Sequence, residues 1–187
     1  MSSTTTDPAG SAGGVVLRWL DATSDTDVAL WRDVRLAMLL DTPGAFGSRY
    51  ADHLGLGLER WRENVASPVM STLVAVEGGA PVGAARLMEG GDDLPELISM
   101  FVAPAHRGTG LSSRIVEAVA DRARGRGHAA LHLHVMTDNP RARGVYERGG
   151  FRCVGAPFRA APDDPDDLRT EWRMERPLRG AGAGMES

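Results

Sequence analysis

The chain has 187 residues, with a hydrophobic fraction of 42%, a charged fraction of 25% and a formal net charge of −4. These values are ordinary for a single globular domain, and they lack the basic excess that indicates a nucleic-acid partner. The single cysteine, Cys153, excludes an internal disulfide and a zinc site built from cysteines. No apolar run approaches the ~20 residues that cross a membrane, so we expect no membrane partner.

The two ends of the chain differ in composition from the middle. Residues 1–14, MSSTTTDPAGSAGG, have neither the basic start nor the apolar segment of a secretory signal. This stretch and residues 179–187 have the composition of flexible tails, so we predict one ordered domain over residues 15–178. We expect a cytoplasmic protein.

The first half of the domain predicts a strand, two helices and a hairpin, at Val15–Leu20, Asp25–Leu40, Leu56–Val65 and Ser71–Met88. The first helix has apolar residues at near-helical spacing, and Asp25 or Asp27 is the expected cap. It should stop before Pro43, where a loop begins. The hairpin is indicated by two β-type runs that flank Gly78-Gly79.

The second half alternates strands and helices and then ends in two strands. These elements are predicted at Glu96–Ala103, Arg114–Gly127, Ala130–Val135, Asn139–Gly150, Phe151–Gly155 and Leu168–Leu178. The first of them is mostly apolar, which is typical of a strand buried on both faces. Asn139 is the expected cap of the second helix, with Pro140 at its first position. The order indicates a mixed α/β (α+β) sheet with helices on both faces.

A glycine-rich turn, Arg107-Gly108-Thr109-Gly110, stands where a strand gives way to a helix. Bare amides at a helix N-terminus, backed by the helix dipole, form an anion site. Arg107 would add charge, and Ser112 and Ser113 would add hydroxyls. The turn therefore favours a pyrophosphate ligand, with a plain glycine turn beside a surface arginine as the alternative. The spacing fits neither the phosphate loop of nucleotide hydrolases nor the dinucleotide fingerprint.

Two motifs in the second half carry a family resemblance. VAPAHRGTGLS followed by NPRARGVYERGGF resembles the GNAT superfamily of N-acetyltransferases, which use acetyl-coenzyme A. Arg107, Gly110 and Ser112 occupy the places of the family's pyrophosphate motif, although Ser112 replaces its final Gly or Ala. The places of the second motif are taken by Asn139, Ala142 and Tyr146. The early stretch Trp31–Ser48 is more loosely similar to the acceptor-side helix and loop of many bacterial members.

The resemblance implies a twisted, mostly antiparallel sheet of about seven strands. In this fold the fourth and fifth strands splay apart, and the pantetheine arm of the coenzyme lies in the gap. An amide near Met100–Val102 would face the thioester carbonyl, an oxyanion-type stabilisation. The implied coenzyme-binding residues are Met100, Phe101, Val102, Arg107, Gly108, Thr109, Gly110, Leu111, Ser112, Ser113, Asn139, Ala142 and Tyr146.

Two side chains are candidates for proton transfer. Tyr146 matches the family's acid for the departing thiolate; otherwise it is an aromatic residue packed on the sheet. Glu96 matches the glutamate base of histone-type members; otherwise it is a solvated residue at a strand end. Asp92 and Asp93 are weaker candidates for the base.

Other polar residues carry less specific signals. His132 and His134 share one strand face, but a zinc site needs more ligands and no third is visible, so we predict no metal. They should pack beside a helix or reach the cleft. His106 could touch a phosphate or be exposed. Cys153 is expected to be a buried structural thiol. The acidic loop Asp163–Asp167 either attracts a cationic amine or is simply solvated.

These observations predict an acyltransferase that moves an acetyl group from acetyl-coenzyme A to a primary amine of a small molecule or peptide. Transfer of a longer acyl group and a regulatory module that only binds coenzyme A are the alternatives. The sequence does not name the acceptor. The sequence leaves the oligomeric state open, although dimers are common among members of the family, which makes a homodimer one option here.

Overall fold

A computed structural model describes residues 14–43, 48–90 and 94–178 of the chain. The predicted tails, apart from Gly14, lie outside these ranges, as do Asp92 and Asp93. The strands are β1 (Val16–Trp19), β2 (Met70–Glu77), β3 (Ala80–Met88), β4 (Glu96–Val102), β5 (Ala130–Met136), β6 (Arg152–Arg159) and β7 (Thr170–Pro177). The helices are α1 (Asp25–Asp41), α2 (Ala51–Leu54), α3 (Leu58–Val65), α4 (Leu111–Gly125), α5 (Pro140–Arg148) and the short 3₁₀ helix η1 (Pro104–His106).

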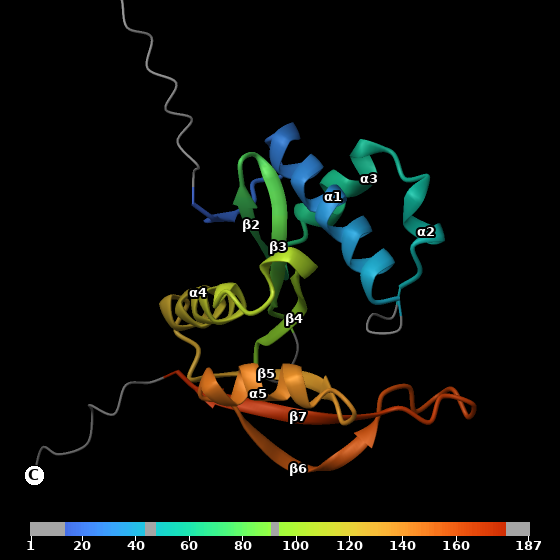
Figure 1. Cartoon of the computed structure of the whole chain (residues 1–187), viewed down its shortest axis with the longest axis vertical. Coiled ribbons are helices and arrows are strands. Elements are labelled where there is room, and N and C mark those ends of the chain that lie inside the picture. Colours follow the sequence, from blue (N-terminus) through green and yellow to red (C-terminus); the bar gives the residue numbers. More distant parts are fainter. Residues whose placement is uncertain (1–13, 44–47, 91–93, 179–187) are drawn as a thin grey trace, which may run out of the picture.

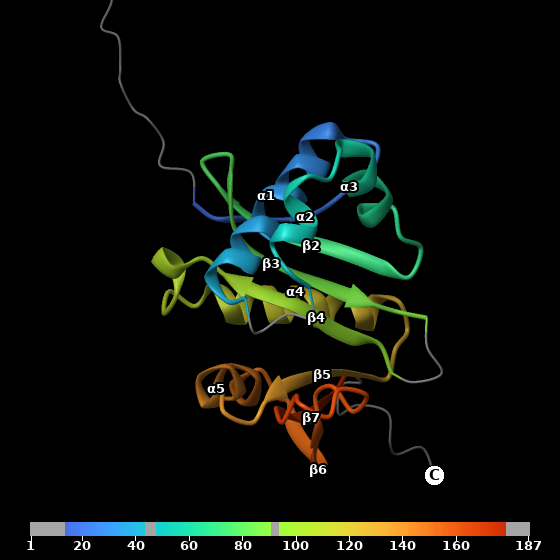
Figure 2. The ribbon, with the colours of Figure 1, turned by 90° about the vertical axis from the view of Figure 1, so that its right-hand side faces the viewer.

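The strands form one seven-stranded sheet in the order β1-β2-β3-β4-β5-β7-β6. All neighbours are antiparallel except β4 and β5, which are parallel and pair at a single position, Glu96 with His132. Beyond that pair the two strands diverge (Figure 2). The predicted sheet, mostly antiparallel and with splayed fourth and fifth strands, is confirmed.

Helices α4 and α5 cover one face of the sheet. The predicted apolar stripe of α4 is buried completely or almost so, and it packs on inward-facing residues of β2, β3 and β5. Tyr146 of α5 and Phe151 join the same core. Figure 1 shows α5 beside β5 and β7, at the half of the sheet that α1 and α3 do not cover.

The opposite face is covered by α1 and α3, over β2 to β4. Trp31 and Val34 of α1 and Trp61 of α3 meet Val74 and Phe101 of the sheet in a second core. Successive side chains of β5 point alternately to the two faces of the sheet. Leu131, Leu133 and Val135 point to the α4 side, so the residues between them point to the α1 side.

Four local expectations were wrong or incomplete. The cap of α1 is Ser24, whose hydroxyl accepts the Asp27 amide hydrogen, while the Asp27 carboxylate accepts from the Asp21 amide. The single-turn helix α2 was missed because four residues carry no readable period. In β4 only Leu97 and Phe101 are buried, because the strand leaves its neighbour β5 after one pair. Cys153 is exposed, since it lies on the edge strand β6, which is exposed along its whole length.

Two further features follow from the sequence. The turn between β2 and β3 is made by Gly78 and Gly79, both with positive φ, as the hairpin prediction requires. No helix among the described residues combines the length and the apolar character needed to cross a membrane.

Candidate active site

The N-terminus of α4 presents bare backbone. Gly108 and Gly110 have φ values of 85° and 86°, a region that residues with a Cβ seldom adopt. A Cβ added at either glycine would meet nothing within 4 Å, so the space outside the turn is open. Helix α4 has no side-chain cap and no acidic residue in its first turn. The geometry is that of an anion site at a helix N-terminus.

The side chains of the turn are already engaged with the protein. The Arg107 guanidinium donates to the Val102 carbonyl at 3.0 Å and forms an ion pair with Asp41 at the end of α1. Thr109 donates its hydroxyl hydrogen to the His106 carbonyl. His106 itself is half-buried and contacts the Glu77 carboxylate at 2.9 Å. The side chains of Arg107 and Thr109 therefore already have partners within the protein, which leaves the backbone of the turn as the predicted anion-binding group.

The edge of β4 that faces β5 is free of strand pairing beyond Glu96. A bulge interrupts the strand between Ile98 and Phe101, and Ser99 there has φ of 54°, the only positive φ of a non-glycine residue in the described part of the chain. Bulges of this kind redirect backbone groups next to functional sites. The bulge includes Met100 and so overlaps the start of Met100–Val102, the segment predicted to bind the pantetheine arm.

The α5 residues of the second motif have different environments. The Asn139 side chain accepts the Ala142 amide hydrogen at 3.0 Å and so caps the helix, as predicted. Tyr146 is 8% exposed and packs edge-to-face on Phe151, with ring centroids 6.1 Å apart. Burial raises the pKa of Tyr146 to about 12, so the phenol stays protonated at physiological pH. Tyr146 lies on the α4 side of the sheet.

Glu96, His132 and His134 come together on the other face of the sheet. Glu96 Oε1 lies 3.2 Å from His134 Nδ1, and Glu96 Oε2 lies 3.8 Å from His132 Nε2. Hydrogen bonding to Glu96, more than any other cause, raises the pKa of His134 above its ordinary value. Phe158 packs edge-to-face on the His134 ring at 5.0 Å.

This cluster corrects one reading of the sequence. Glu96 is the third group that the two histidines were said to lack, and all three residues offer ligand atoms within 4.8 Å of one another. A two-histidine, one-carboxylate set can bind a divalent metal, and a charged histidine–glutamate pair can equally exchange protons. No spacing rule finds the cluster, because its members come from two strands separated by α4.

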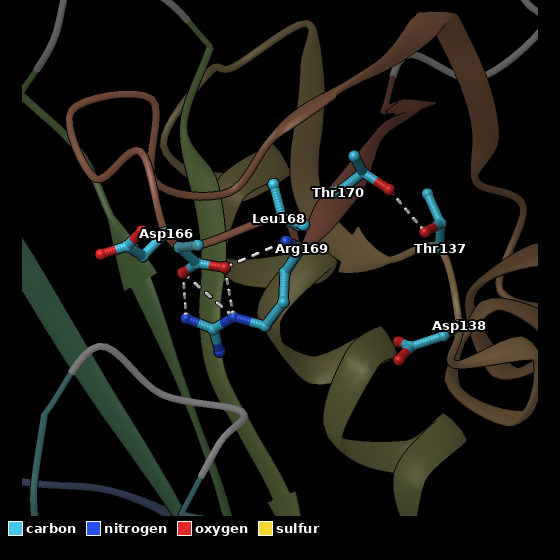
Figure 3. Close-up of a pocket in the computed structure, with 7 residues that line it drawn as sticks. Thr137, Asp138, Asp166, Leu168, Arg169 and Thr170 are labelled. Atoms are coloured by element: carbon cyan, nitrogen blue, oxygen red, sulfur yellow. Dashed lines mark hydrogen bonds and ion pairs between the residues drawn. The ribbon is translucent and has the colours of Figure 1, made fainter.

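Two pockets flank this region. One, of about 610 Å³, opens on the α1 side and includes Trp31, Arg35, Trp61, Arg86 and Ser99. Neither arginine was singled out from the sequence, because an isolated arginine carries no readable signal. The other pocket, of about 430 Å³, lies between the end of β5 and the loop before β7 (Figure 3).

Figure 3 shows how the acidic loop is held at this second pocket. The Arg169 guanidinium donates two hydrogen bonds to the Asp167 carboxylate, from Nε and from one terminal nitrogen. The hydroxyls of Thr137 and Thr170 form a hydrogen bond of 2.7 Å (Figure 3). Hydrogen bonding to Arg169 lowers the pKa of Asp167 to about 2. The charge of Asp167 is therefore already paired within the loop, which weakens the loop's expected attraction for a cationic amine.

The comparisons with known proteins agree with this geometry. The sequence profile of the Acetyltransferase (GNAT) family matches residues 31–151. An IAA acetyltransferase of Azospirillum brasilense is 34% identical over 119 residues, which are 62% of this chain and 73% of the relative. The N-alpha-acetyltransferase RimI of Mycobacterium tuberculosis is 34% identical over 98 residues, 51% of this chain and 60% of the relative.

A solved structure agrees in fold. The structure of yncA from Salmonella typhimurium, with its cofactor acetyl-CoA, has a TM-score of 0.69 at 19% identity and covers 94% of this chain and 100% of that one. The chain belongs to the GNAT acetyltransferase family. It is an acyltransferase, as the two motifs predicted.

Proposed function

We propose that the protein transfers an acetyl group from acetyl-coenzyme A to a primary amine of a small molecule or peptide by direct attack on the thioester. The observation that carries the proposal is that groups able to transfer protons lie on both faces of the sheet. A buried phenol lies on one face of the sheet, and a carboxylate–imidazole cluster lies on the other. Such an arrangement can give a proton on one side and take one on the other.

The coenzyme would bind through backbone groups. Its diphosphate would sit on the amides from Arg107 to Ser113, where the two positive-φ glycines leave open space. Its pantetheine arm would pair with the free edge of β4 at Met100–Val102. Asn139 and Ala142 would contribute by fixing the start of α5, because the Asn139 side chain is occupied in capping it.

The proton of the amine would pass to the Glu96–His134 pair. The amine nitrogen attacks the carbonyl carbon and the carbon–sulfur bond breaks, with the electron pair going to sulfur. The protonated pair is stabilised by the 3.2 Å contact between its members. Glu96 therefore acts together with His134 rather than alone.

The departing sulfur would accept a hydrogen bond from the Tyr146 hydroxyl and then take its proton, and solvent would reprotonate the phenolate as coenzyme A leaves. None of the described residues forms a hydrogen bond with this hydroxyl, and burial is the one cause of its raised pKa. The proposal requires this hydroxyl to face the sulfur of a coenzyme bound between β4 and β5. A homodimer and a cytoplasmic location stay predictions.

Release of free thiol from acetyl-coenzyme A tests the reaction, with a polyamine, free amino acids and short peptides as acceptors. Cys153 is exposed and would itself react with a thiol reagent, so Cys153→Ser is the suitable background. We expect amine-dependent thiol release that is unchanged by EDTA, because no step uses a metal. Coenzyme binding with no release for any amine would support the regulatory module instead, and loss of activity in EDTA would assign the Glu96 cluster to a metal.

A further inference from the structure

The pocket on the α1 side is lined by a buried arginine, Arg86. Arg86 on β3 is a charged side chain with only 5% of its surface exposed. Its guanidinium donates to Asn64 Oδ1 at 3.1 Å and to the Asn64 carbonyl at 2.8 Å, and it lies over the Trp31 ring at 4.9 Å. Its Nε–H has no hydrogen-bond acceptor among the described residues.

The acceptors of Arg86 are all neutral. Among residues 14–43, 48–90 and 94–178, no carboxylate lies within 4.0 Å of its nitrogens. Burial and then the nearby charge of Arg35 lower the pKa of Arg86 to about 10. A buried cation beside a like charge costs free energy until an anion joins it.

The acidic residues that line the same pocket do not fill this role. Glu63 forms an ion pair with Arg60 at 2.6 Å, and both are well exposed. Asp52 is exposed on α2. The buried guanidinium of Arg86 therefore has no carboxylate partner among the described residues that line the pocket.

The pocket lies beside the base proposed above. Arg86 pairs with Ile98 on β4, and Ile98 lines the pocket. Glu96 precedes Ile98 by two residues, so it projects from the same face of the sheet about 7 Å along the strand. A compact ligand can thus reach both the guanidinium and the base.

The rest of the lining mixes a few aromatic residues with polar and aliphatic ones, among them Ser67, Leu56 and Met70. Trp31 and Trp61 line the pocket, and the His53 ring lies 5.8 Å from the Trp61 ring. The Trp31 indole is itself fixed, because its Nε1–H donates to Asn64 Oδ1 at 2.7 Å. A volume of about 610 Å³ suits a small molecule or the end of a peptide.

We infer that this pocket binds the acceptor through a carboxylate held by Arg86 beside Arg35, so that the substrate is an amine that also carries a carboxylate. The inference rests on the proposed acetyl transfer for the role of the amine. The carboxylate site itself is independent of catalysis and can be tested by binding alone. Bidentate binding of a carboxylate is the typical use of an ordered guanidinium.

Calorimetry with phenylacetate and phenylacetamide provides that test, since the two differ in the charged group and share the ring. The wild-type protein should bind phenylacetate at least tenfold more tightly, and Arg86→Gln should remove the difference. Arg60→Gln is the matched control, because it removes an exposed arginine from the rim of the same pocket and should leave the preference intact. Thermal denaturation should show that the variants are folded.

Equal affinity for the two probes, or no binding of phenylacetate, would overturn the inference. Arg86→Gln could fail to fold if the role of Arg86 is to connect α3 to the sheet through Asn64. In that case the comparison of the two probes in the wild-type protein alone decides the inference. A second arm measures thiol release with phenylalanine and phenylalaninamide. Release with the amide but not the acid would retain acetyl transfer and reject the carboxylate site. If the protein prefers the carboxylate probe in binding but releases no thiol with either amine, the carboxylate site is retained and the proposed acetyl transfer is rejected.

Discussion

Tyr146 shows how packing sets the chemistry available to a single residue. Its ring packs against Phe151, and the same burial raises the pKa of its hydroxyl to about 12. An ordinary thiol has a pKa near ~8.5, so complete proton transfer from this phenol to a thiolate is uphill. Its main contribution would therefore be a hydrogen bond to the sulfur as negative charge develops, with the proton following as coenzyme A leaves.

Tyr146→Phe should slow the chemical step by roughly 10²-fold, the lower end of the range for acid catalysis, because the donor is weak. The ring and its contact with Phe151 remain, so the thermal midpoint should change little. Single-turnover measurement is needed, since product release can limit the steady state. A wild-type single-turnover rate in the variant would leave Tyr146 with a packing role and assign thiolate protonation to solvent.

At the scale of elements, sequence patterns predicted most helices and strands but not what covers them. The apolar stripe of α4 and the alternation along β5 each determined a buried face directly. The apolar run of β4 suggested burial on both faces, whereas the splay from β5 leaves Ile98 to line a pocket. Cys153 alternates like a core residue, yet β6 is an edge strand whose residues are all exposed. Burial depends on neighbours that a local pattern does not contain.

The N-terminus of α4 is the element whose function can be tested most cleanly. Gly110→Glu should weaken coenzyme A binding at least tenfold, about 1.4 kcal/mol or more, because a carboxylate would occupy the diphosphate site. Gly127→Glu is the matched control. Gly127 follows the other end of α4, has a φ of 88° against 86° for Gly110, and has equally open space around an added Cβ. Calorimetry that finds equal affinities in both variants would remove the phosphate role from the turn.

At the scale of the whole molecule, the sheet separates the two proposed proton-transfer groups, Tyr146 and the Glu96–His134 pair, which no sequence motif connects. Tyr146 was found through the family motif, and Glu96 through its position at the start of β4. The contact of Glu96 with His134 depends on the parallel pairing of β4 with β5, which places Glu96 opposite His132. The sequence did not indicate Arg86 either, because its environment depends on neighbours from α1, α3 and β4, which only the folded topology brings together. The fold was therefore predictable from local patterns and motifs, whereas the site required the topology.

With the pair as the proposed base, the raised pKa of His134 would give catalysis and stability opposite dependences on pH. The pair stabilises the folded state below the ordinary histidine value of about 6.5, and this contribution is lost as pH rises through the higher folded pKa. As a base, the pair works only after His134 has lost its proton, so activity should rise over the same interval. A fall in activity at low pH therefore cannot be ascribed to loss of this pair's contribution to stability.

The pH dependence of the single-turnover rate in wild type and Glu96→Gln tests the central claim most directly, namely that the Glu96–His134 pair takes the proton of the amine. The wild-type rate should rise with pH through an inflection above about 6.5, because Glu96 raises the pKa of His134. In Glu96→Gln the inflection should move down toward that ordinary value, and the rate on the plateau above it should fall, because the weaker base accepts the amine's proton less readily. Coenzyme binding should be unchanged. Superimposable profiles for the two proteins would contradict the account and assign deprotonation of the amine to another group or to water.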